Sequence, residues 1–264
     1  MKQYIFLVEG SHDLAVIGKI LNCIGYRELR NIENISENFR KLIPQKFPFS
    51  EKGDLDIFNV IPAFFKLKKD NEKECKEIVI INSNGESKHF EKLDKVLDTF
   101  EIKEKRELEK IIVFSDSDTF DIESKIKELI KINFGNKSFI NFKEKNIINR
   151  KIDLEIKVID IEFYIFPDNK KIGRLENLVF EGIKKQDNEL LEKTIEFINL
   201  VPDKYKSSWS VNNSQKDKTI IGTLGNVLYP CCSAPVFLQK SRWISENTCK
   251  EKHIKELYEF LLKI

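Results

Sequence analysis

Acidic residues stand directly after two short apolar runs of the sequence. Glu9 follows the run QYIFLV at residues 3–8, and Asp116-Ser117-Asp118 closes the run KIIVFSD at residues 110–116. In an extended backbone, residues i and i+2 point to the same side, so Asp116 and Asp118 are expected to present two carboxylates together. Grouped carboxylates repel one another unless a cation lies between them, and their hard oxygen atoms suit Mg²⁺ or Mn²⁺. Such an ion can polarise a phosphate, so these residues predict metal-dependent phosphoryl transfer.

Two glycines accompany the acids. Gly10 follows Glu9, and Gly85 closes the turn Ser83-Asn84-Gly85 after the apolar run EIVIIN at residues 77–82. Because glycine has no Cβ, it lets the backbone pass close to a phosphate, and we assign Gly10 and Gly85 to substrate binding. Taken singly, each of these features is more often a solvated turn than a site. Their ordered recurrence after three strands is what predicts a function.

Strands and helices alternate in the part of the chain that carries these residues. The runs at 3–8, 77–82 and 110–116 are continuous and apolar, as strands buried on both faces are. Amphipathic segments follow them: Asp13 to about Cys23, with Ser11 as the expected N-cap, then 87–100 and 122–130. This alternation predicts an α/β fold with a mainly parallel sheet flanked by helices. Sites in such sheets form at the carboxyl ends of the strands, where the acids lie.

The remaining segments predict an insertion and an extension. Residues 30–76 are rich in proline and lysine, and we expect an insertion after the first helix with little regular structure. Residues 151–166 predict two further strands, 188–200 and 250–264 predict helices, 202–218 a polar loop, and 219–229 are ambiguous. We therefore expect a core over 1–180, interrupted by 30–76, and a C-terminal helical extension over 181–264 packed on it.

Composition narrows the class of protein. The 264 residues include 45 Lys and Arg against 43 Asp and Glu, for a net charge of +2, so charge alone does not indicate nucleic-acid binding. No apolar run is long enough for a membrane span, and the expected location is the cytoplasm. The five cysteines contain no CxxC pair, and the adjacent Cys231 and Cys232 are expected to be reduced thiols.

The ordered set of motifs resembles the Toprim domain of topoisomerases, bacterial primases and several nucleases. The matching segments are FLVEGSHD (6–13), IVIINSNG (78–85) and IIVFSDSD (111–118), within roughly the first 165 residues. The resemblance implies a compact parallel sheet between helices. It also implies that Glu9 is a general acid/base or metal ligand, and that Asp116 and Asp118 bind metal. Asp13 could be an ordinary helix acid, and the resemblance favours the metal site.

The second half of the chain resembles OLD-type nucleases and a small stand-alone Toprim-like family. The segment YIFPDNKKIGRLENLVF (164–180) carries Leu175-Glu176, and the resemblance implies that Glu176 holds a second metal. Glu176 could equally be a first-turn glutamate favoured by the helix dipole. The catalytic lysine of OLD-type enzymes has two candidates here, Lys216 and Lys218, and the sequence does not choose between them. His12 is interpreted as incidental.

Two functions of different classes follow from these residues. The first is a Mg²⁺- or Mn²⁺-dependent nuclease acting on DNA or RNA. The second is a non-catalytic or partner-activated module of a larger assembly, because the chain has no GxxxxGK[ST] motif and a separate ATPase would have to act as partner. The segments FNVIPAFF (58–65) and PCCSAPVFLQKSRW (230–243) could form a partner surface, although core is the simpler interpretation. Assembly into a homo-oligomer stays open. Primase- or topoisomerase-like chemistry is a weaker third option, since the accessory domains are not recognised.

Overall fold

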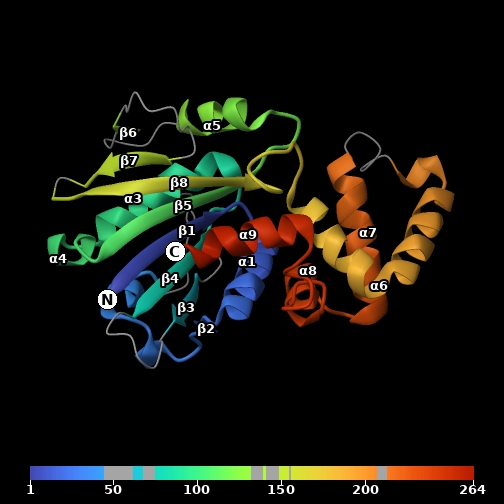
Figure 1. Cartoon of the computed structure of the whole chain (residues 1–264), viewed down its shortest axis with the longest axis horizontal. Helices are drawn as coiled ribbons and strands as arrows, with labels where there is room; N and C mark the ends of the chain where they lie inside the picture. The colour runs from blue at the N-terminus through green and yellow to red at the C-terminus, as the bar shows by residue number, and fades with distance from the viewer. Residues whose placement is uncertain (45–61, 68–74, 132–138, 141–148, 155, 207–212) are drawn as a thin grey trace, which may run out of the picture.

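The chain folds as an eight-stranded mixed sheet between two layers of helices (Figure 1). The computed structural model describes residues 1–44, 62–67, 75–131, 139–140, 149–154, 156–206 and 213–264. The strands are β1 (Lys2–Val8), β2 (Arg27–Glu28), β3 (Ala63–Leu67), β4 (Lys76–Asn82), β5 (Leu108–Asp116), β6 (Phe139–Ile140), β7 (Asn149–Asp153) and β8 (Val158–Phe166). The helices are α1 (Ser11–Ile24), α2 (Glu37–Arg40), α3 (His89–Thr99), α4 (Ile102–Lys105), α5 (Ile122–Lys131), α6 (Leu175–Leu200), α7 (Asn213–Leu228), α8 (Ala234–Lys240) and α9 (Lys252–Leu262).

The centre of the sheet is parallel and its edges are antiparallel. The strand order is β2-β3-β4-β1-β5-β8-β7-β6, with β4, β1, β5 and β8 mutually parallel. The outer strands pair antiparallel with their neighbours on both sides. The expected α/β fold with a largely parallel sheet is confirmed. Because the four central strands run in one direction, their carboxyl ends meet at one edge of the sheet.

Two apolar cores lie on the two faces of the sheet. Along β1, Phe6 and Val8 face the core shared with α1, α6, α7, α8 and α9, whereas Ile5 and Leu7 face the core shared with α2, α3 and α5. All four side chains are fully buried. Burial on both faces explains why β1, β4 and β5 are uninterrupted apolar runs in the sequence.

The start of α1 differs from the expectation in one residue. The N-cap is Gly10, not Ser11, and Ser11 is the first helical residue. Asp13 stands at the third helical position, and its Oδ2 accepts the backbone N–H of Gly10 at 2.8 Å. An acid at this position satisfies a backbone donor that the helix leaves free, so the cap needs no side chain at residue 10.

The insertion and the C-terminal extension hold more regular structure than expected. Within 30–76, α2 and the strand β3 are formed, and β3 pairs antiparallel with β4. The polar loop expected over 202–218 is wrong from residue 213, where α7 begins. The helix α8 was not expected at all. The expected helices at 188–200 and 250–264 are confirmed as part of α6 and as α9.

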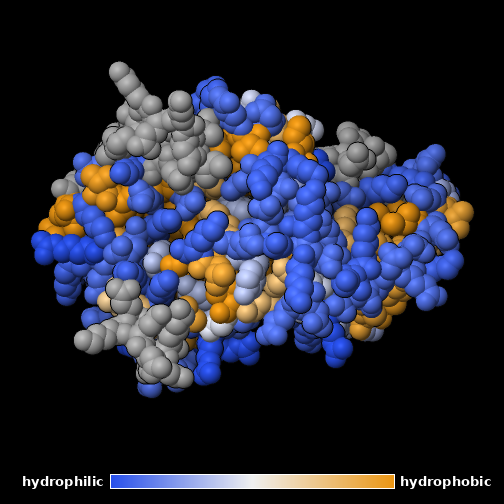
Figure 2. All heavy atoms as spheres, in the orientation of Figure 1, coloured by the Kyte–Doolittle hydropathy of each residue, from blue (hydrophilic) through white to orange (hydrophobic). Residues whose placement is uncertain are grey.

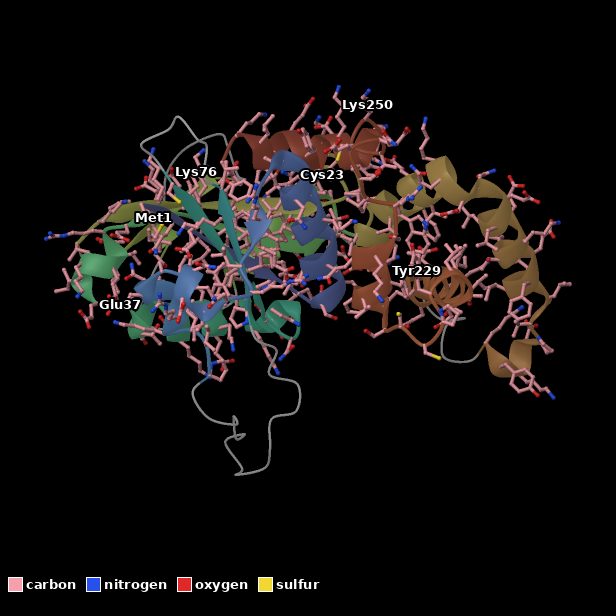
Figure 3. The ribbon with its side chains drawn as sticks, turned by 90° about the horizontal axis from the view of Figure 1, so that it is seen from below. Met1, Cys23, Glu37, Lys76, Tyr229 and Lys250 are labelled. Carbon is pink, nitrogen blue, oxygen red and sulfur yellow. The ribbon has the colours of Figure 1, made fainter. Side chains whose placement is uncertain are left out.

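Helices α6 and α7 project beyond the end of the sheet, as the views in Figures 1 and 3 agree. The backbone of α6 is non-helical at Asp187 (φ −138°, ψ 43°), whose Oδ2 accepts the indole N–H of the buried Trp243 at 2.7 Å. In the part of the chain that the structure describes, no helix has the length and apolar character that a membrane span requires.

The two segments considered as partner surfaces contribute to the cores. Phe64 and Phe65 of the first segment are buried, as are Phe237, Leu238 and Trp243 of the second. Residues 58–61 lie outside the described residues. The face drawn in Figure 2 is mostly hydrophilic, with apolar areas scattered among polar ones.

Candidate functional site

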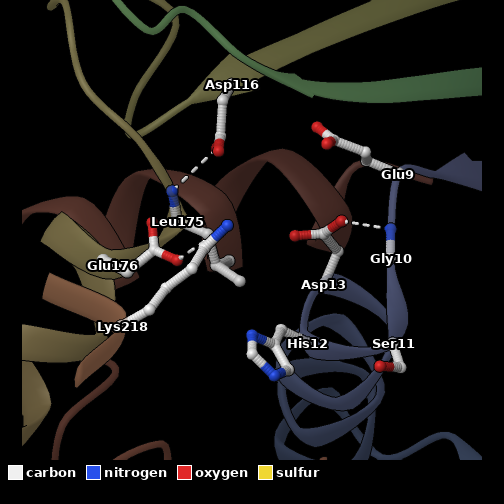
Figure 4. Close-up of a pocket in the computed structure, with 9 residues that line it drawn as sticks. All are labelled: Glu9, Gly10, Ser11, His12, Asp13, Asp116, Leu175, Glu176 and Lys218. Atoms are coloured by element: carbon white, nitrogen blue, oxygen red, sulfur yellow. Dashed lines mark hydrogen bonds and ion pairs between the residues drawn. The ribbon is translucent and has the colours of Figure 1, made fainter. Parts of the chain in front are cut away.

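A cavity of about 220 Å³ opens where β1 and β5 end and where α1, α6 and α7 begin (Figure 4). It brings together residues that are more than 200 positions apart in the chain. Its lining consists of Glu9, Gly10, Ser11, His12, Asp13, Asp116, Leu175, Glu176 and Lys218. Most of the expected site residues therefore lie around one cavity.

The residues from β1 and α1 are fixed by the backbone turn between them. Glu9 follows the last residue of β1, and its carbonyl oxygen accepts the N–H of Gly85 at 3.0 Å. Gly85 has a φ of +117°, which favours glycine. Gly85 is not part of the cavity lining, and its assignment to substrate binding stays a prediction. It instead supports the backbone of Glu9, while Gly10 lies at the cavity.

The residues from β5 and α6 are joined by a set of hydrogen bonds that we call the clasp, formed by residues 116–118 and 173–175. The N–H of Leu175 donates to Asp116 Oδ1 at 2.9 Å. Ser117 Oγ accepts the N–H of Gly173 at 2.6 Å and donates to the carbonyl of Gly173 at 3.0 Å. The clasp positions the first turn of α6, and therefore Glu176, beside Asp116.

Crowding of carboxylates changes the protonation of the site. Burial raises the pKa of Asp13 to about 7, although some of its surface is exposed at the cavity, and the charges of Glu9 and Glu176 add to the shift. Burial, followed by the charges of Asp13 and Glu176, raises the pKa of Asp116 well above its ordinary value. Burial raises the pKa of Glu9, and the negative charges of Glu86 and Asp118 add to the shift. The mutual repulsion of these acids disfavours their simultaneous ionisation, and a cation bound in the cavity would relieve it.

The oxygen atoms of the cavity fit a hard divalent cation. Glu176 is 4% exposed, and its Oε2 is buried without a hydrogen-bond partner. Burial raises its pKa, which the charge of Lys218 opposes. Within the described ranges, no three Asp, Glu, His or Cys side chains are already grouped at metal-binding distance. Binding of an ion would thus require these carboxylates to rotate toward one another, which removal of their mutual repulsion would favour.

Asp118, unlike Asp116, is not part of the cavity lining. The strand β5 ends at Asp116, and Asp118 has a left-handed φ of +53°, so the alternation of an extended backbone no longer applies. Its Oδ1 accepts from Arg174 Nε at 2.8 Å, and its Oδ2 lies 3.9 Å from Lys125 Nζ. Asp116 thus lines the cavity and Asp118 does not, and the assignment of Asp118 as a metal ligand stays a prediction.

The two candidate lysines are separated by the structure. Lys218 lines the cavity, with its Nζ 3.9 Å from Glu176 Oε1. Lys216 instead donates to Asn199 Oδ1 at 3.1 Å and is not part of the lining. The sequence could not choose between them because their positions on α7 were unknown.

His12, interpreted from the sequence as incidental, also lines the cavity. Burial lowers its pKa, as does the charge of Lys218, so the ring is neutral at neutral pH. Its place between Gly10 and Asp13 in the first turn of the helix was the available signal.

A family model described as a protein of unknown function, DUF3226, matches residues 3–228. The structure of a hypothetical protein from Pyrococcus horikoshii OT3 is similar, with a TM-score of 0.53 and 20% identity over 100% of this chain and 98% of that one. This likeness supports the fold.

Weaker likenesses connect the chain to the C-terminal regions of two OLD proteins. For the one from Xanthomonas campestris pv. campestris, the TM-score is 0.40 and the identity 11%, over 99% of this chain and 93% of that one. For the one from Burkholderia pseudomallei, the values are 0.41 and 10%, over 99% and 97%. At these scores they add no argument about the site. No curated protein matches the sequence.

Proposed function

The chain belongs to the DUF3226 family, and we propose that it is a Toprim-type nuclease that hydrolyses phosphodiester bonds of DNA or RNA with Mg²⁺ or Mn²⁺. One observation carries the proposal: the carboxylates of Glu9, Asp13, Asp116 and Glu176 surround one cavity together with the ammonium group of Lys218. The pKa of each of these four acids is raised, mainly by burial, which is the electrostatic condition of a site that receives a cation.

The metal would be held by Glu9, Asp13, Asp116 and Glu176. When bound, it supplies polarisation of the phosphate and a more acidic water. Glu9 lies at the cavity with a raised pKa, which suits a residue that orients water and accepts its proton. Gly10 presents backbone without a Cβ to the incoming phosphate, and Asp13 is its nearest neighbour on that side.

Lys218 would supply positive charge on the opposite side of the cavity from Glu9. Its side chain is 43% exposed, so it can leave Glu176 for a phosphate oxygen at the cavity mouth. A cation aimed at the position where negative charge develops lowers the barrier of phosphoryl transfer. The cavity therefore provides a base and a stabilising cation from opposite walls, as in-line displacement requires.

The test is cleavage by the purified chain. Single- and double-stranded DNA and RNA are incubated with Mn²⁺, with Mg²⁺ and with EDTA, and products are resolved on denaturing gels. We expect cleavage with either ion and none with EDTA. Glu9→Gln and Asp116→Asn are each expected to abolish it, because both remove a carboxylate from the cavity.

A matched control separates the site from a general loss of acidic charge. Glu189→Gln removes one carboxylate from an exposed position of α6 and is expected to leave cleavage unchanged. Cleavage that persists in EDTA, or that is equal in wild type and in both cavity variants, would contradict the proposal.

A partner-activated module is the second candidate function, favoured by exposed apolar side chains near the far end of α6. Phe197 is 57% exposed, Leu200 82% and Tyr205 63%. A separate ATPase or a further copy of the chain could contact them. Light scattering after size exclusion, combined with Mn²⁺ titration, separates the candidates. A chain that binds Mn²⁺ but cleaves nothing until a partner is added supports the second.

A further inference from the structure

Asp118 is not part of the cavity lining and forms ion pairs with two largely buried cations, although its charge also acts on Glu9, whose pKa it helps to raise. Arg174 Nε lies 2.8 Å from its Oδ1, and Lys125 Nζ lies 3.9 Å from its Oδ2. The side chains of Arg174 and Lys125 are 13% and 4% exposed, whereas that of Asp118 is 44% exposed. Asp118 is therefore an accessible carboxylate whose present direction is set by its partners.

Arg174 occupies a position from which it can act on both the clasp and the cavity. Its neighbours in the chain, Gly173 and Leu175, are hydrogen-bonded to Ser117 and Asp116, so its backbone cannot move far. Burial raises the pKa of Glu176, and the positive charge of Arg174 is among the interactions that oppose this. The guanidinium is therefore paired with Asp118 and also close enough to Glu176 for its charge to act on that carboxyl.

The positive charge of Lys125 is balanced by carboxylates other than that of Asp118. Its Nζ lies 2.8 Å from Glu86 Oε2 and 3.7 Å from Glu128 Oε2, both closer than Asp118. The ion pair with Arg174 is thus the tighter of the two contacts that hold Asp118. Loss of that one contact would leave a long, weak interaction and a mobile carboxylate.

We propose that Arg174 is a phosphate-binding residue whose guanidinium is occupied by Asp118 when nucleic acid is absent. A nucleic-acid phosphate then replaces the Asp118 carboxylate on the guanidinium of Arg174. The planar guanidinium binds phosphate through two parallel hydrogen bonds, which is the stronger form of charge-assisted contact. The released Asp118 carboxylate then turns to the edge of the cavity and joins the acids that receive the metal. This inference rests on the proposed nuclease function and adds a coupling between substrate and metal.

The proposed coupling predicts how tightly the protein binds metal with and without nucleic acid. Without nucleic acid, Asp118 contributes little to metal affinity, since its charge is used by Arg174. In the presence of nucleic acid, the metal affinity rises, and the rise depends on Asp118. By linkage, the metal must also tighten the binding of nucleic acid by the same factor.

The first experiment is calorimetric titration of Mn²⁺ into wild type, Arg174→Ala, Asp118→Asn and the double variant, without nucleic acid. We expect Arg174→Ala to bind Mn²⁺ at least about fivefold more tightly than wild type, the lower end of common coupling factors. The double variant should return to the wild-type value, and Asp118→Asn alone should match wild type. An unchanged or weaker affinity in Arg174→Ala, or a clear loss in Asp118→Asn alone, overturns the inference.

The second experiment measures the phosphate contact itself. A fluorescein-labelled single-stranded DNA oligonucleotide, and an RNA of the same sequence, are titrated in EDTA and followed by anisotropy. Arg174→Ala should weaken binding of at least one of the two oligonucleotides by about tenfold. The affinity of Arg174→Lys should be intermediate, because lysine keeps the positive charge but cannot donate two parallel hydrogen bonds to a phosphate. Wild-type affinity for both oligonucleotides in Arg174→Ala overturns the inference.

The two experiments also separate this inference from the proposed function. A wild-type chain that binds no Mn²⁺ contradicts the proposed function, whereas normal Mn²⁺ binding with no effect of Arg174→Ala contradicts the coupling alone. Thermal melts identify variants that fail to fold. Asp118→Asn needs no substitution at Arg174, so its titration tests the inference even if the Arg174 variants unfold.

Discussion

At the scale of single residues, the two lysines at the start of α7 differ in what they contact. Lys218 reaches the cavity and Glu176, whereas Lys216 is bound to Asn199 on α6. We expect Lys218→Ala to lower the cleavage rate by roughly a hundredfold, as removal of a transition-state cation or donor commonly does. Lys216→Ala should leave it nearly unchanged. Single-turnover cleavage by the two variants measures the difference, and equal losses in both would contradict the assignment.

The buried acids also predict how stability depends on pH in the absence of metal. The pKa of Asp13 is about 7 in the folded chain and near 4 when unfolded, so the folded state binds more protons between those values. The free energy of unfolding therefore falls as pH rises from about 4 to 7. The raised pKa of Asp116 acts in the same direction.

Thermal melts in EDTA at mildly acidic and neutral pH measure this effect. One proton per pH unit is worth about 1.4 kcal/mol, so we expect the Tm of wild type to fall by roughly 3–6 °C per unit relative to Asp13→Asn. Saturating Mn²⁺ should restore the Tm at neutral pH, because the ion replaces the lost protons. Parallel pH curves for wild type and Asp13→Asn would show that Asp13 is not the titrating group.

At the scale of elements, the contact between α6 and the segment before α9 depends on a glycine. A Cβ added to Gly182 would lie 1.9 Å from the carbonyl oxygen of Trp243, which is backbone and cannot turn aside. Gly182→Ala is expected to destabilise the fold by about 1–3 kcal/mol or more through overpacking. Its matched control is Gly222→Ala in α7, where a Cβ meets nothing within 4 Å.

The control should move stability in the opposite direction. Alanine inside a helix is favoured over glycine by roughly 0.5–1 kcal/mol, so Gly222→Ala is expected to raise the Tm slightly. Urea unfolding of both variants gives the two free energies. A neutral Gly182→Ala would mean that the segment carrying Trp243 can move away from α6.

The elements that the sequence predicted well are those whose burial is local and continuous. β1, β4 and β5 are found within about two residues of their predicted bounds, since strands covered on both faces leave an apolar run. The strand β3 was missed because its apolar residues adjoin Pro62 and a lysine-rich stretch, and its pairing with β4 is a distant contact. The start of α7 was missed for a similar reason. Its sequence NSQKDKT is polar, and the apolar packing that anchors the helix comes later, at Ile220, Ile221 and Leu224.

The positions of Glu9 and Asp116 could be predicted from the topology of the sheet, whereas the direction of the Asp118 side chain could not. Glu9 and Asp116 line one cavity, as the shared edge of parallel strand ends predicts. Asp13 and Glu176, which only the resemblance to Toprim and OLD-type proteins favoured, line the same cavity. Asp118 is not part of the cavity lining, and its left-handed φ directly after a strand has no signature in an Asp-Ser-Asp sequence. Arg174, its partner across the clasp, is separated from it by 56 positions and gave no local signal.

At the scale of the whole molecule, the cavity depends on both halves of the chain. The parallel order β4-β1-β5-β8 supplies Glu9 and Asp116, and the clasp joins this edge to α6. Lys218 comes from α7, which packs against α6 beyond the end of the sheet. The predicted C-terminal extension thus contributes a residue to the cavity, and its removal would take the ammonium group of Lys218 away from the acids.

The overall charge predicts how nucleic-acid binding responds to salt. With 45 basic and 43 acidic residues, the chain has no net charge excess comparable to that of proteins that bind DNA through a broad basic surface. Lys218 at the cavity and Arg174 beside it are the cations that our proposals bring to phosphate. Two neutralised phosphates give a slope of log affinity against log salt between about −1 and −2, whereas extensive contacts give −6 or steeper. Anisotropy titrations of a labelled oligonucleotide at increasing KCl measure this slope. A shallow slope that becomes still shallower in Lys218→Ala and in Arg174→Ala would place the main contact with nucleic acid at the cavity. A steep slope that is unchanged in both variants would place that contact on a basic surface elsewhere in the chain.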